Sequence, residues 1–178
     1  MGKKTLFLDR DGVINVRNFN GYIAHPDDFI FLNNAIEGII KLRTFFDYVI
    51  IVTNQQGVGK GLMTLDMVNR VHEKMSNELE KNGCLLDAIF IATNLAEETP
   101  NRRKPNSAMA LEAQQLFPEI NFSEALMVGD TDTDILFGKN LGMKTACVSS
   151  KEIVTQKSDY VVTDLLELYY TVKNKRNE

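Results

Sequence analysis

The chain has 178 residues, of which 44% are hydrophobic and 25% are charged, and this length and balance predict a single globular domain over residues 1–178. The formal net charge of −4 gives no electrostatic reason to expect nucleic acid or an anionic membrane as a partner, and the sequence indicates no oligomeric state. Cys84 and Cys147 lie far apart and no signal peptide or apolar stretch of about 18 residues is evident, so we expect a cytoplasmic protein without disulfides.

Short apolar runs with turn residues behind them predict buried strands, and amphipathic segments between them predict helices. The expected strands are residues 6–9, 48–53, 88–92, 125–129, 144–148 and 160–162. The expected helices are residues 34–46, 65–82, 107–117, 133–141 and 164–173. Gly83 and Gly142 fall where a helix C-cap belongs, and Asp132 or Thr133 is expected to cap the fourth helix. Because strands alternate with helices, the sequence predicts an α/β fold, a Rossmann-like doubly wound parallel sheet covered on both faces.

Two carboxylates stand two residues apart where the first strand ends. Asp9 closes the apolar run, and Asp11 follows directly before Gly12. Ligands of open α/β sheets collect outside the carboxyl ends of the strands, and residues two apart in an extended chain point the same way. Paired carboxylates repel unless a cation lies between them, and a hard cation such as Mg²⁺ takes oxygen ligands. The pair predicts a metal site, an acid/base dyad or both; solvated acids in a turn are the alternative.

The second strand ends in Thr53, which opens a glycine-rich segment over residues 53–61. Glycines let the backbone approach a ligand, and loops of this type cradle phosphate oxygens. The segment is not a P-loop, because the Gly-Lys-Ser/Thr order is absent. A phosphate-binding loop and a flexible connection both fit the pattern.

A second acidic cluster follows the fourth expected strand, after Gly129. Asp130 comes first off this strand and is the best candidate for a metal ligand in the cluster. Asp134 falls in the first turn of the next helix, where a carboxylate also favours the helix dipole, so support of a metal and a helix-start role both remain open. Asp132 is expected to face solvent or to cap the helix.

A basic segment, Arg102, Arg103 and Lys104, precedes Pro105 and the third expected helix. A lysine held before a proline could neutralise phosphate and nearby carboxylates. A solvated basic turn is the alternative for this segment alone.

Taken together and in order, these segments resemble the four motifs of the haloacid-dehalogenase-like (HAD) phosphatases. Residues 9–12 match the family's Asp-x-Asp-Gly, Thr53 its second motif, Lys104 its third, and residues 129–134 its Gly-Asp-x-x-x-Asp. The match spans most of the chain. The resemblance implies the family's sheet order, 5-4-1-2-3, which would make the ends of the strands that carry Asp9 and Asp130 neighbours.

Within the family, the chain resembles the branch that contains histidinol-phosphate phosphatase and D,D-heptose 1,7-bisphosphate phosphatase. The matching residues are 9–15, 25–29, 53–55 and 103–105. Polynucleotide 3′-phosphatases share part of this signature. One departure is clear: the branch usually carries a Cys/His zinc loop before Arg-Lys-Pro, whereas residues 92–102 contain neither residue type. A structural zinc site takes about four nitrogen or sulfur ligands, so we predict no zinc.

The resemblance implies that Asp9 is the nucleophile and forms an aspartyl-phosphate. A Mg²⁺ ion held by Asp9, by the main-chain carbonyl of Asp11 and by Asp130 would cancel the repulsion between carboxylate and phosphate. Asp11 would protonate the leaving alkoxide and then deprotonate the attacking water. For that role we expect its carboxyl to face away from the metal and its pKa to exceed that of a free aspartate.

The remaining site residues are assigned by the same resemblance. Thr53 and the Asn54 amide would hold the phosphoryl oxygens, and Lys104 would balance charge in the transition state. Arg103 is expected to contact the rest of the substrate, and Thr131 is a weaker candidate for substrate binding. The short segments between the expected elements leave no room for a cap domain, so the site should be open and lidded only by loops.

The sequence therefore predicts a Mg²⁺-dependent phosphomonoester hydrolase for a small phosphorylated metabolite, with a sugar bisphosphate such as D,D-heptose 1,7-bisphosphate as the first candidate. Histidinol phosphate is the next candidate in that class. A polynucleotide 3′-phosphatase and an inactive binding protein of the same fold are the alternatives; the acidic balance disfavours the former and the intact motifs the latter. His72 falls in an expected helix, where it should be packed or solvated rather than catalytic.

Overall fold

The computed structural model describes residues 2–176, which form one six-stranded sheet in the order β3-β2-β1-β4-β5-β6. All neighbouring strands run parallel. The strands are β1 (Thr5–Leu8), β2 (Tyr48–Asn54), β3 (Ala88–Ala92), β4 (Leu126–Gly129), β5 (Lys144–Val148) and β6 (Tyr160–Val162). The predicted parallel sheet and its central order are confirmed, and β6 extends the sheet beyond β5.

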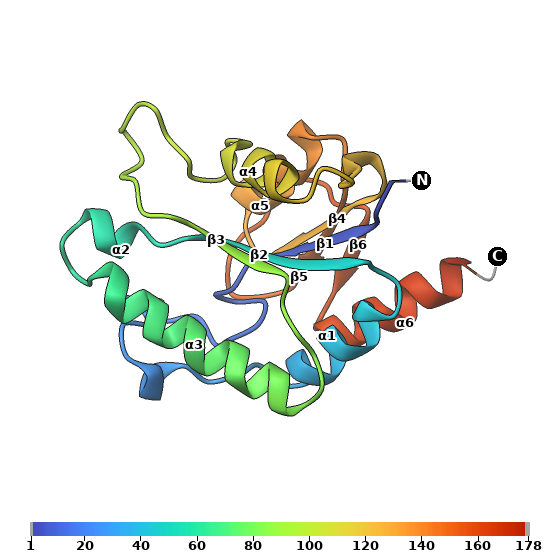
Figure 1. Ribbon diagram of the computed structural model, residues 1–178, viewed down its shortest axis with the longest axis horizontal. Helices are drawn as coiled ribbons and strands as arrows, with labels where there is room; N and C mark the ends of the chain where they lie inside the picture. The colour runs from blue at the N-terminus through green and yellow to red at the C-terminus, as the bar shows by residue number, and fades with distance from the viewer. Residues whose placement is uncertain (1, 177–178) are drawn as a thin grey trace.

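Helices cover both faces of the sheet, as predicted (Figure 1). One face carries α4 (Ala108–Leu116) and α5 (Asp132–Asn140). The other carries α1 (Ala35–Arg43), α3 (Leu65–Lys81) and α6 (Leu165–Arg176). A one-turn helix, α2 (Gln56–Gly59), lies inside the glycine-rich segment, which the sequence had predicted as a loop. Two 3₁₀ turns, η1 (Pro26–Asp28) and η2 (Phe122–Glu124), complete the elements.

Two apolar cores form because successive strand residues face opposite sides of the sheet. In β1, the buried side chains of Leu6 and Leu8 pack toward α1, α3 and α6, whereas Phe7 packs toward α4 and α5. The strands are apolar on both faces for this reason, which explains why they appear in the sequence as continuous runs rather than as alternating patterns.

The strand register places the polar strand ends beside one another. Leu8 pairs with Val128 in β4 and with Ile51 in β2, and the amide of Asp9 donates to the carbonyl of Val128 at 2.9 Å. Asp9 therefore leaves the sheet level with Gly129. Asp9 and Gly129 thus lie together at the carboxyl ends of β1 and β4. The strand order reverses between these two strands, and ligands of doubly wound sheets bind at this point.

The connections at this edge are short within the described chain. Between β1 and α1 there is only a loop with the η1 turn, and between β2 and α3 only α2 and its flanking loop. Gly83 and Gly142 adopt φ of 81° and 72°, as expected of residues that follow helix ends. The N-cap of α5 is Thr131, so the prediction of Asp132 or Thr133 at this position was wrong by one or two residues.

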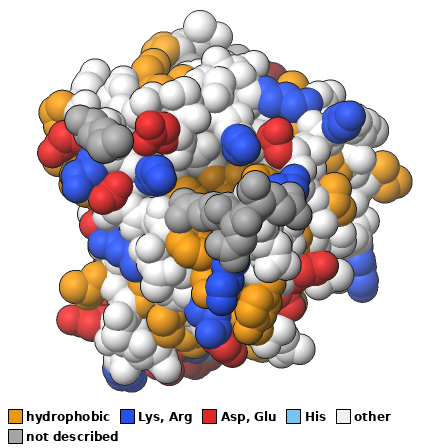
Figure 2. Space-filling model, turned by 90° about the vertical axis from the view of Figure 1, so that its right-hand side faces the viewer, with side chains coloured by type: hydrophobic (Ala, Val, Ile, Leu, Met, Phe, Trp, Pro, Cys, Tyr) orange, Lys and Arg blue, Asp and Glu red, His pale blue; other side chains and the backbone are white. Residues whose placement is uncertain are grey.

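The opposite edge, at the amino ends of the strands, carries charged side chains of both signs (Figure 2). Basic and acidic groups alternate over this face around a small apolar hollow, so this view shows no surface of a single sign. Among residues 2–176, no helix is long and apolar enough to cross a membrane.

Candidate active site

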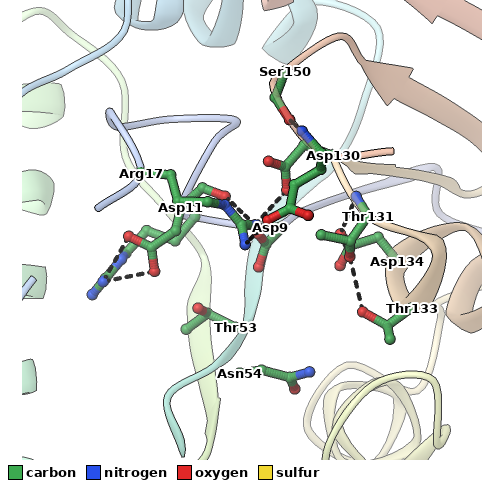
Figure 3. A network of polar contacts seen from close by, with 12 residues as sticks. Asp9, Asp11, Arg17, Thr53, Asn54, Asp130, Thr131, Thr133, Asp134 and Ser150 are labelled. Atoms are coloured by element: carbon green, nitrogen blue, oxygen red, sulfur yellow. Dashed lines mark hydrogen bonds and ion pairs between the residues drawn. The ribbon is translucent and has the colours of Figure 1, made fainter. Parts of the chain in front are cut away.

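Three carboxylates meet at the carboxyl edge of the sheet. Asp9 follows β1, Asp130 follows β4, and Asp134 lies in the first turn of α5; each is at most 5% exposed. One carboxylate oxygen from each lies within 4.8 Å of the others, and Figure 3 shows Asp9, Asp130 and Asp134 converging. Buried acids this close repel unless positive charge lies between them.

Lys104 supplies one positive charge to this cluster. Its Nζ lies 2.6 Å from Asp9 Oδ1 and 2.7 Å from Asp134 Oδ1, and it donates to the carbonyl of Val52 at 2.6 Å. Burial acts to lower the pKa of Lys104, but the two carboxylates outweigh burial and raise it. The lysine therefore stays charged, and the sequence prediction that it neutralises nearby acids is confirmed for Asp9 and extended to Asp134.

Asn54 holds the lysine in place from the end of β2. Its side-chain carbonyl accepts from the backbone amide of Lys104 at 2.9 Å, and its side-chain amide donates to the backbone carbonyl of Lys104 at 3.2 Å. The two bonds fix one residue of an otherwise irregular segment. The side chain of Asn54 therefore positions Lys104, and a direct contact with substrate stays a prediction.

Arg17 supplies a second positive charge that the sequence analysis missed. Its Nη2 lies 2.5 Å from Asp130 Oδ1, 2.9 Å from the main-chain oxygen of Asp11 and 3.9 Å from Asp9 Oδ2. Burial acts to lower the pKa of Arg17, but Asp130 and the other acids raise it. One nitrogen thus contacts all three groups predicted to bind Mg²⁺. Arg17 lies in a loop without a motif, so no local pattern could have identified it.

Even with both cations, the cluster is short of positive charge. Burial first, and then repulsion from neighbouring acids, raises the pKa of Asp9 to about 6 and that of Asp130 to about 7, against the opposing effects of Lys104 and Arg17. Asp130 Oδ2 is buried and, within the described chain, has no hydrogen-bond partner. Clustered, dehydrated carboxylate oxygens are the donors that a hard divalent cation prefers, so these residues fit Mg²⁺.

Among the three clustered acids, Asp134 has the most hydrogen-bonding and ionic contacts. Besides the contact of Oδ1 with Lys104, its Oδ2 accepts from the amide of Thr131 at 3.1 Å and from the Thr131 hydroxyl at 2.6 Å. This capping box turns the side chain inward. The helix-start role left open by the sequence is filled, and the carboxylate also belongs to the acidic cluster; support of a metal by Asp134 stays a prediction. Because the hydroxyl of Thr131 is used by the cap, a contact of Thr131 with substrate stays a prediction.

Asp11 differs from the cluster in orientation and in charge. Its carboxylate points away from Asp9 and Asp130, as expected (Figure 3). It accepts from Arg10 Nη2 at 2.8 and 3.0 Å and from Asn15 at 3.0 Å. Burial acts to raise the pKa of Asp11, but Arg10 and the hydrogen bonds hold the pKa below that of a free aspartate. The predicted raised pKa was therefore wrong, because the neighbouring arginine is buried beside the carboxylate rather than exposed.

Gln55 links Asp11 to Thr53 at the end of β2. Its amide nitrogen donates to Asp11 Oδ2 at 3.0 Å and to the hydroxyl oxygen of Thr53 at 2.9 Å. Since the hydroxyl of Thr53 accepts this bond, its own proton remains free to be donated. Thr53 is 1% exposed and lies beside the acidic cluster, in a position compatible with the predicted contact to a phosphoryl oxygen.

A cavity of about 290 Å³ opens in front of the cluster. Its lining includes Asp9, Asp11, Tyr22 and Arg103. Arg103 Nη1 is buried and, among the described residues, has no hydrogen-bond partner. An unpaired guanidinium group at the wall of a cavity suits an anionic ligand group, which is consistent with the predicted substrate contact.

The segment that departs from the zinc-binding branch is organised by side-chain amides. Asn101 Nδ2 donates to the carbonyls of Leu95 and Ala96 at 3.0 and 2.9 Å. The amide of Arg102 donates to Asn94 Oδ1 at 3.3 Å. Hydrogen bonds thus fold this loop without thiol or imidazole groups, and the prediction that the protein binds no zinc stays a prediction.

Glycines in the two acidic motifs make room for the cluster. A Cβ atom at Gly12, where φ is +89°, would lie 2.0 Å from Asp130 Oδ2, and one at Gly129 would lie 2.0 Å from Asp134 Cβ. Contacts below 3.0 Å require the neighbouring group to move. Gly12 therefore follows from the close approach of the two motifs, in addition to its backbone conformation, and Gly129 follows from the approach of Asp134 within its own motif.

A comparison with protein families matches residues 101–168 to the HAD-hydrolase-like family. Among curated relatives, a D-glycero-alpha-D-manno-heptose-1,7-bisphosphate 7-phosphatase of Mycobacterium tuberculosis (strain H37Rv) is 32% identical over 148 residues, which cover 83% of this chain and 78% of the relative. A D-glycero-beta-D-manno-heptose-1,7-bisphosphate 7-phosphatase of Pasteurella multocida is 30% identical, with coverage of 98% and 100%.

Among solved structures, the D,D-heptose 1,7-bisphosphate phosphatase from B. bronchiseptica, complexed with magnesium and phosphate, superimposes with a TM-score of 0.85. The two chains are 25% identical, and the match covers 97% of this chain and 99% of that one. The similarity therefore extends over the whole fold rather than over the motifs alone.

The crowding at Gly12 predicts that two glycine substitutions at positive φ differ in their effect on activity. Gly12→Ala should lower activity on the order of 100-fold, because the new methyl group displaces Asp130. Gly142→Ala, at φ +72° with no heavy atom within 4 Å, should cost roughly 1–2 kcal/mol of stability and leave activity unchanged. Thermal unfolding and hydrolysis of 4-nitrophenyl phosphate measure both effects. Equal activity in the two variants would show that crowding at Gly12 does not matter.

Proposed function

The chain belongs to the HAD-like phosphatases, and from this premise we propose that it is a Mg²⁺-dependent phosphatase whose substrate is a heptose 1,7-bisphosphate. The observation that carries the proposal is the buried group of Asp9, Asp130 and Asp134 around Lys104 at the switch point of the sheet. The substrate class is suggested by the relatives, whose names specify both the alpha and the beta anomer.

The metal would be held by the carboxylates of Asp9 and Asp130 and by the main-chain oxygen of Asp11, the three groups that one nitrogen of Arg17 now contacts. Bound there, Mg²⁺ would neutralise charge between the carboxylate and the phosphoryl oxygens. Arg17 would have to withdraw from at least part of this position. A neighbour solved with magnesium and phosphate supports the choice of ion.

Asp9 is the proposed nucleophile. Its Oδ1 is held by Lys104 at 2.6 Å, and one oxygen of the carboxylate would attack the phosphorus atom while the other faces the metal. The new bond would form between the attacking oxygen and phosphorus, and the bond between phosphorus and the ester oxygen would break, giving an aspartyl-phosphate and an alkoxide. Lys104 and the Thr53 hydroxyl would hold the phosphoryl oxygens during the transfer.

Asp11 is the proposed acid and base. It would give a proton to the departing alkoxide, and in the second step accept a proton from the water that attacks phosphorus and frees Asp9. The resting carboxylate is ionised, since its pKa is lowered. A phosphate dianion bound beside it would raise that pKa again, because like charges disfavour the ionised form. Protonation of Asp11 is thus coupled to substrate binding.

The far phosphate of a bisphosphate would meet Arg103, the unpaired guanidinium at the wall of the cavity. Guanidinium groups bind phosphate through two parallel hydrogen bonds, which fixes orientation as well as affinity. A substrate with a second anionic group is therefore favoured over a simple monoester by the lining of the site.

The substrate proposal is tested by kcat/KM for the alpha and beta anomers of D-glycero-D-manno-heptose 1,7-bisphosphate, histidinol phosphate and a 3′-phosphorylated oligonucleotide. We expect one heptose bisphosphate to exceed the other two classes by at least about tenfold, roughly the 1–3 kcal/mol of a charge-assisted hydrogen bond. Arg103→Met should remove most of that margin. Preference for either other class would overturn the substrate proposal while leaving the phosphatase activity intact.

The nucleophile is tested by Asp9→Asn. Turnover of 4-nitrophenyl phosphate should fall below detection while the circular dichroism spectrum stays native, because the amide oxygen cannot form a phosphoenzyme. Asp132→Asn is the matched control, since Asp132 lies in the second acidic motif, two residues after Asp130, but accepts hydrogen bonds from Thr155 and Gln156 outside the cluster. Unchanged hydrolysis by Asp9→Asn would falsify the assignment.

The metal site is tested by Arg17→Met. In metal-free protein the variant should unfold at a lower temperature, because Asp130 loses its ion pair. It should bind Mg²⁺ more tightly, on the order of tenfold, because the guanidinium no longer competes. Isothermal titration calorimetry of metal-free protein gives the affinity directly, with Arg103→Met as a control outside the acidic cluster. Weaker Mg²⁺ binding by Arg17→Met would show that Arg17 supports the ion instead.

A further inference from the structure

A buried arginine connects the Asp11 carboxylate to the helix that lies beneath it. Arg10 is 0% exposed. One end of its guanidinium group, Nη2, donates to both oxygens of Asp11 at 2.8 and 3.0 Å. The other end, Nη1, lies 3.1 Å from Nε2 of His72, a residue 62 positions away in α3. A continuous series of hydrogen bonds therefore joins His72 in α3, through Arg10, to Asp11, the proposed acid of the reaction.

His72 is a buried polar residue among apolar neighbours. The buried face of α3 consists of Val68, Val71, His72, Met75 and Leu79. His72 is 5% exposed, and burial together with the charge of Arg10 lowers the pKa of the imidazole to about 3. A neutral imidazole has one nitrogen that accepts, and only Nε2 faces the arginine donor. The geometry therefore assigns Nε2 as the acceptor.

The guanidinium group of Arg10 depends on this acceptor because it has few other hydrogen-bond partners. Nε of Arg10 is buried without a hydrogen-bond partner in the described structure, so the group is held only through its two terminal nitrogens. A single contact with Asp11 would leave it free to rotate about that contact. The second contact, to a helix that is fixed by apolar packing, sets the direction in which Nη2 meets the carboxylate.

From this arrangement we infer that His72 is a positioning residue for the Asp11 carboxylate and acts on it through Arg10. The inference rests on the proposed role of Asp11 as acid and base, and it adds a residue that the four motifs do not contain. His72 is neither a lining residue of the cavity nor one of the three clustered acids, and the contact that connects it to the site is the one with Arg10.

A positioning role has a kinetic signature that general loss of stability lacks. Proton donation by Asp11 matters when the leaving oxygen is strongly basic and matters little when the leaving group is stable as an anion. A misplaced Asp11 therefore slows phenyl phosphate more than 4-nitrophenyl phosphate. Distortion of the whole site, or partial unfolding, slows both to the same extent.

The experiment compares His72→Met with His72→Gln at saturating Mg²⁺. Methionine fills the space without an acceptor, whereas the side-chain oxygen of glutamine can occupy the position of Nε2. For His72→Met we expect kcat/KM on phenyl phosphate, which reports the phosphorylation step and not the later hydrolysis of the aspartyl-phosphate, to fall at least about tenfold, a typical loss for a supporting residue. The fall on 4-nitrophenyl phosphate should stay within about twofold, and His72→Gln should recover most of the loss.

Asp11→Asn and the double variant with His72→Met complete the design. If His72 acts only through Asp11, the second substitution adds nothing in the Asp11→Asn background. Equal losses on both esters, no recovery in His72→Gln, or a further loss in the double variant would each overturn the inference. A flat leaving-group response of Asp11→Asn itself would instead remove the proposed role of Asp11. Should His72→Met fail to fold, His72→Asn, with an acceptor that ends short of Arg10, takes its place in every comparison.

Discussion

The arrangement of the site depends on the cost of burying carboxylates side by side. Three acids at the edge of the sheet are almost completely removed from water, and each buried charge costs several kcal/mol unless it is paired. Lys104 offsets part of this cost, because its amine forms ion pairs with Asp9 and Asp134. A lysine in a loop could not be held there by its own backbone alone. The two hydrogen bonds from Asn54 to its main chain are therefore as necessary to the charge balance as the amine itself.

Opposite environments give the two carboxylates of the first motif different chemistry. Asp9 faces other acids and has a raised pKa, whereas Asp11 faces Arg10 and has a lowered one. These directions are the reverse of those that a nucleophile and an acid need; a divalent cation beside Asp9 and a phosphate dianion beside Asp11 would shift both pKa values back. The two environments follow from the turn after β1, which directs Asp9 toward β4 and Asp11 toward α3.

Residues that end a strand were predictable from the sequence, and those whose partners are distant were not. Asp9 and Asp130 follow apolar strands, so parallel pairing alone brings them together. The inward orientation of Asp134 was not predicted, because an acid in the first turn of a helix is already explained by the helix dipole. The hydrogen bond with Thr131 shows that the side chain faces inward. Arg17 has no motif and reaches Asp130 across 113 positions of the sequence. The pKa of Asp11 was predicted wrongly for a related reason: the burial of Arg10 depends on α3, which no local pattern connects to the first strand.

The loop beside the cavity is held in place by hydrogen bonds between side chains and the main chain. Asn101 crosses the loop to two main-chain carbonyls, and Asn94 accepts from the amide of Arg102. The Arg102 side chain in turn pairs with Glu112 in α4 at 2.5 Å and donates to the carbonyl of Ile91 at the end of β3. These contacts tie the loop to the sheet and to a helix at the point where Arg103 and Lys104 begin. Because Lys104 and Arg103 are consecutive, the ties that place the lysine among the acids also set the position of the guanidinium group at the cavity wall. The charge balance of the acidic cluster and the proposed contact of Arg103 with the far phosphate are thus constrained by the same short segment.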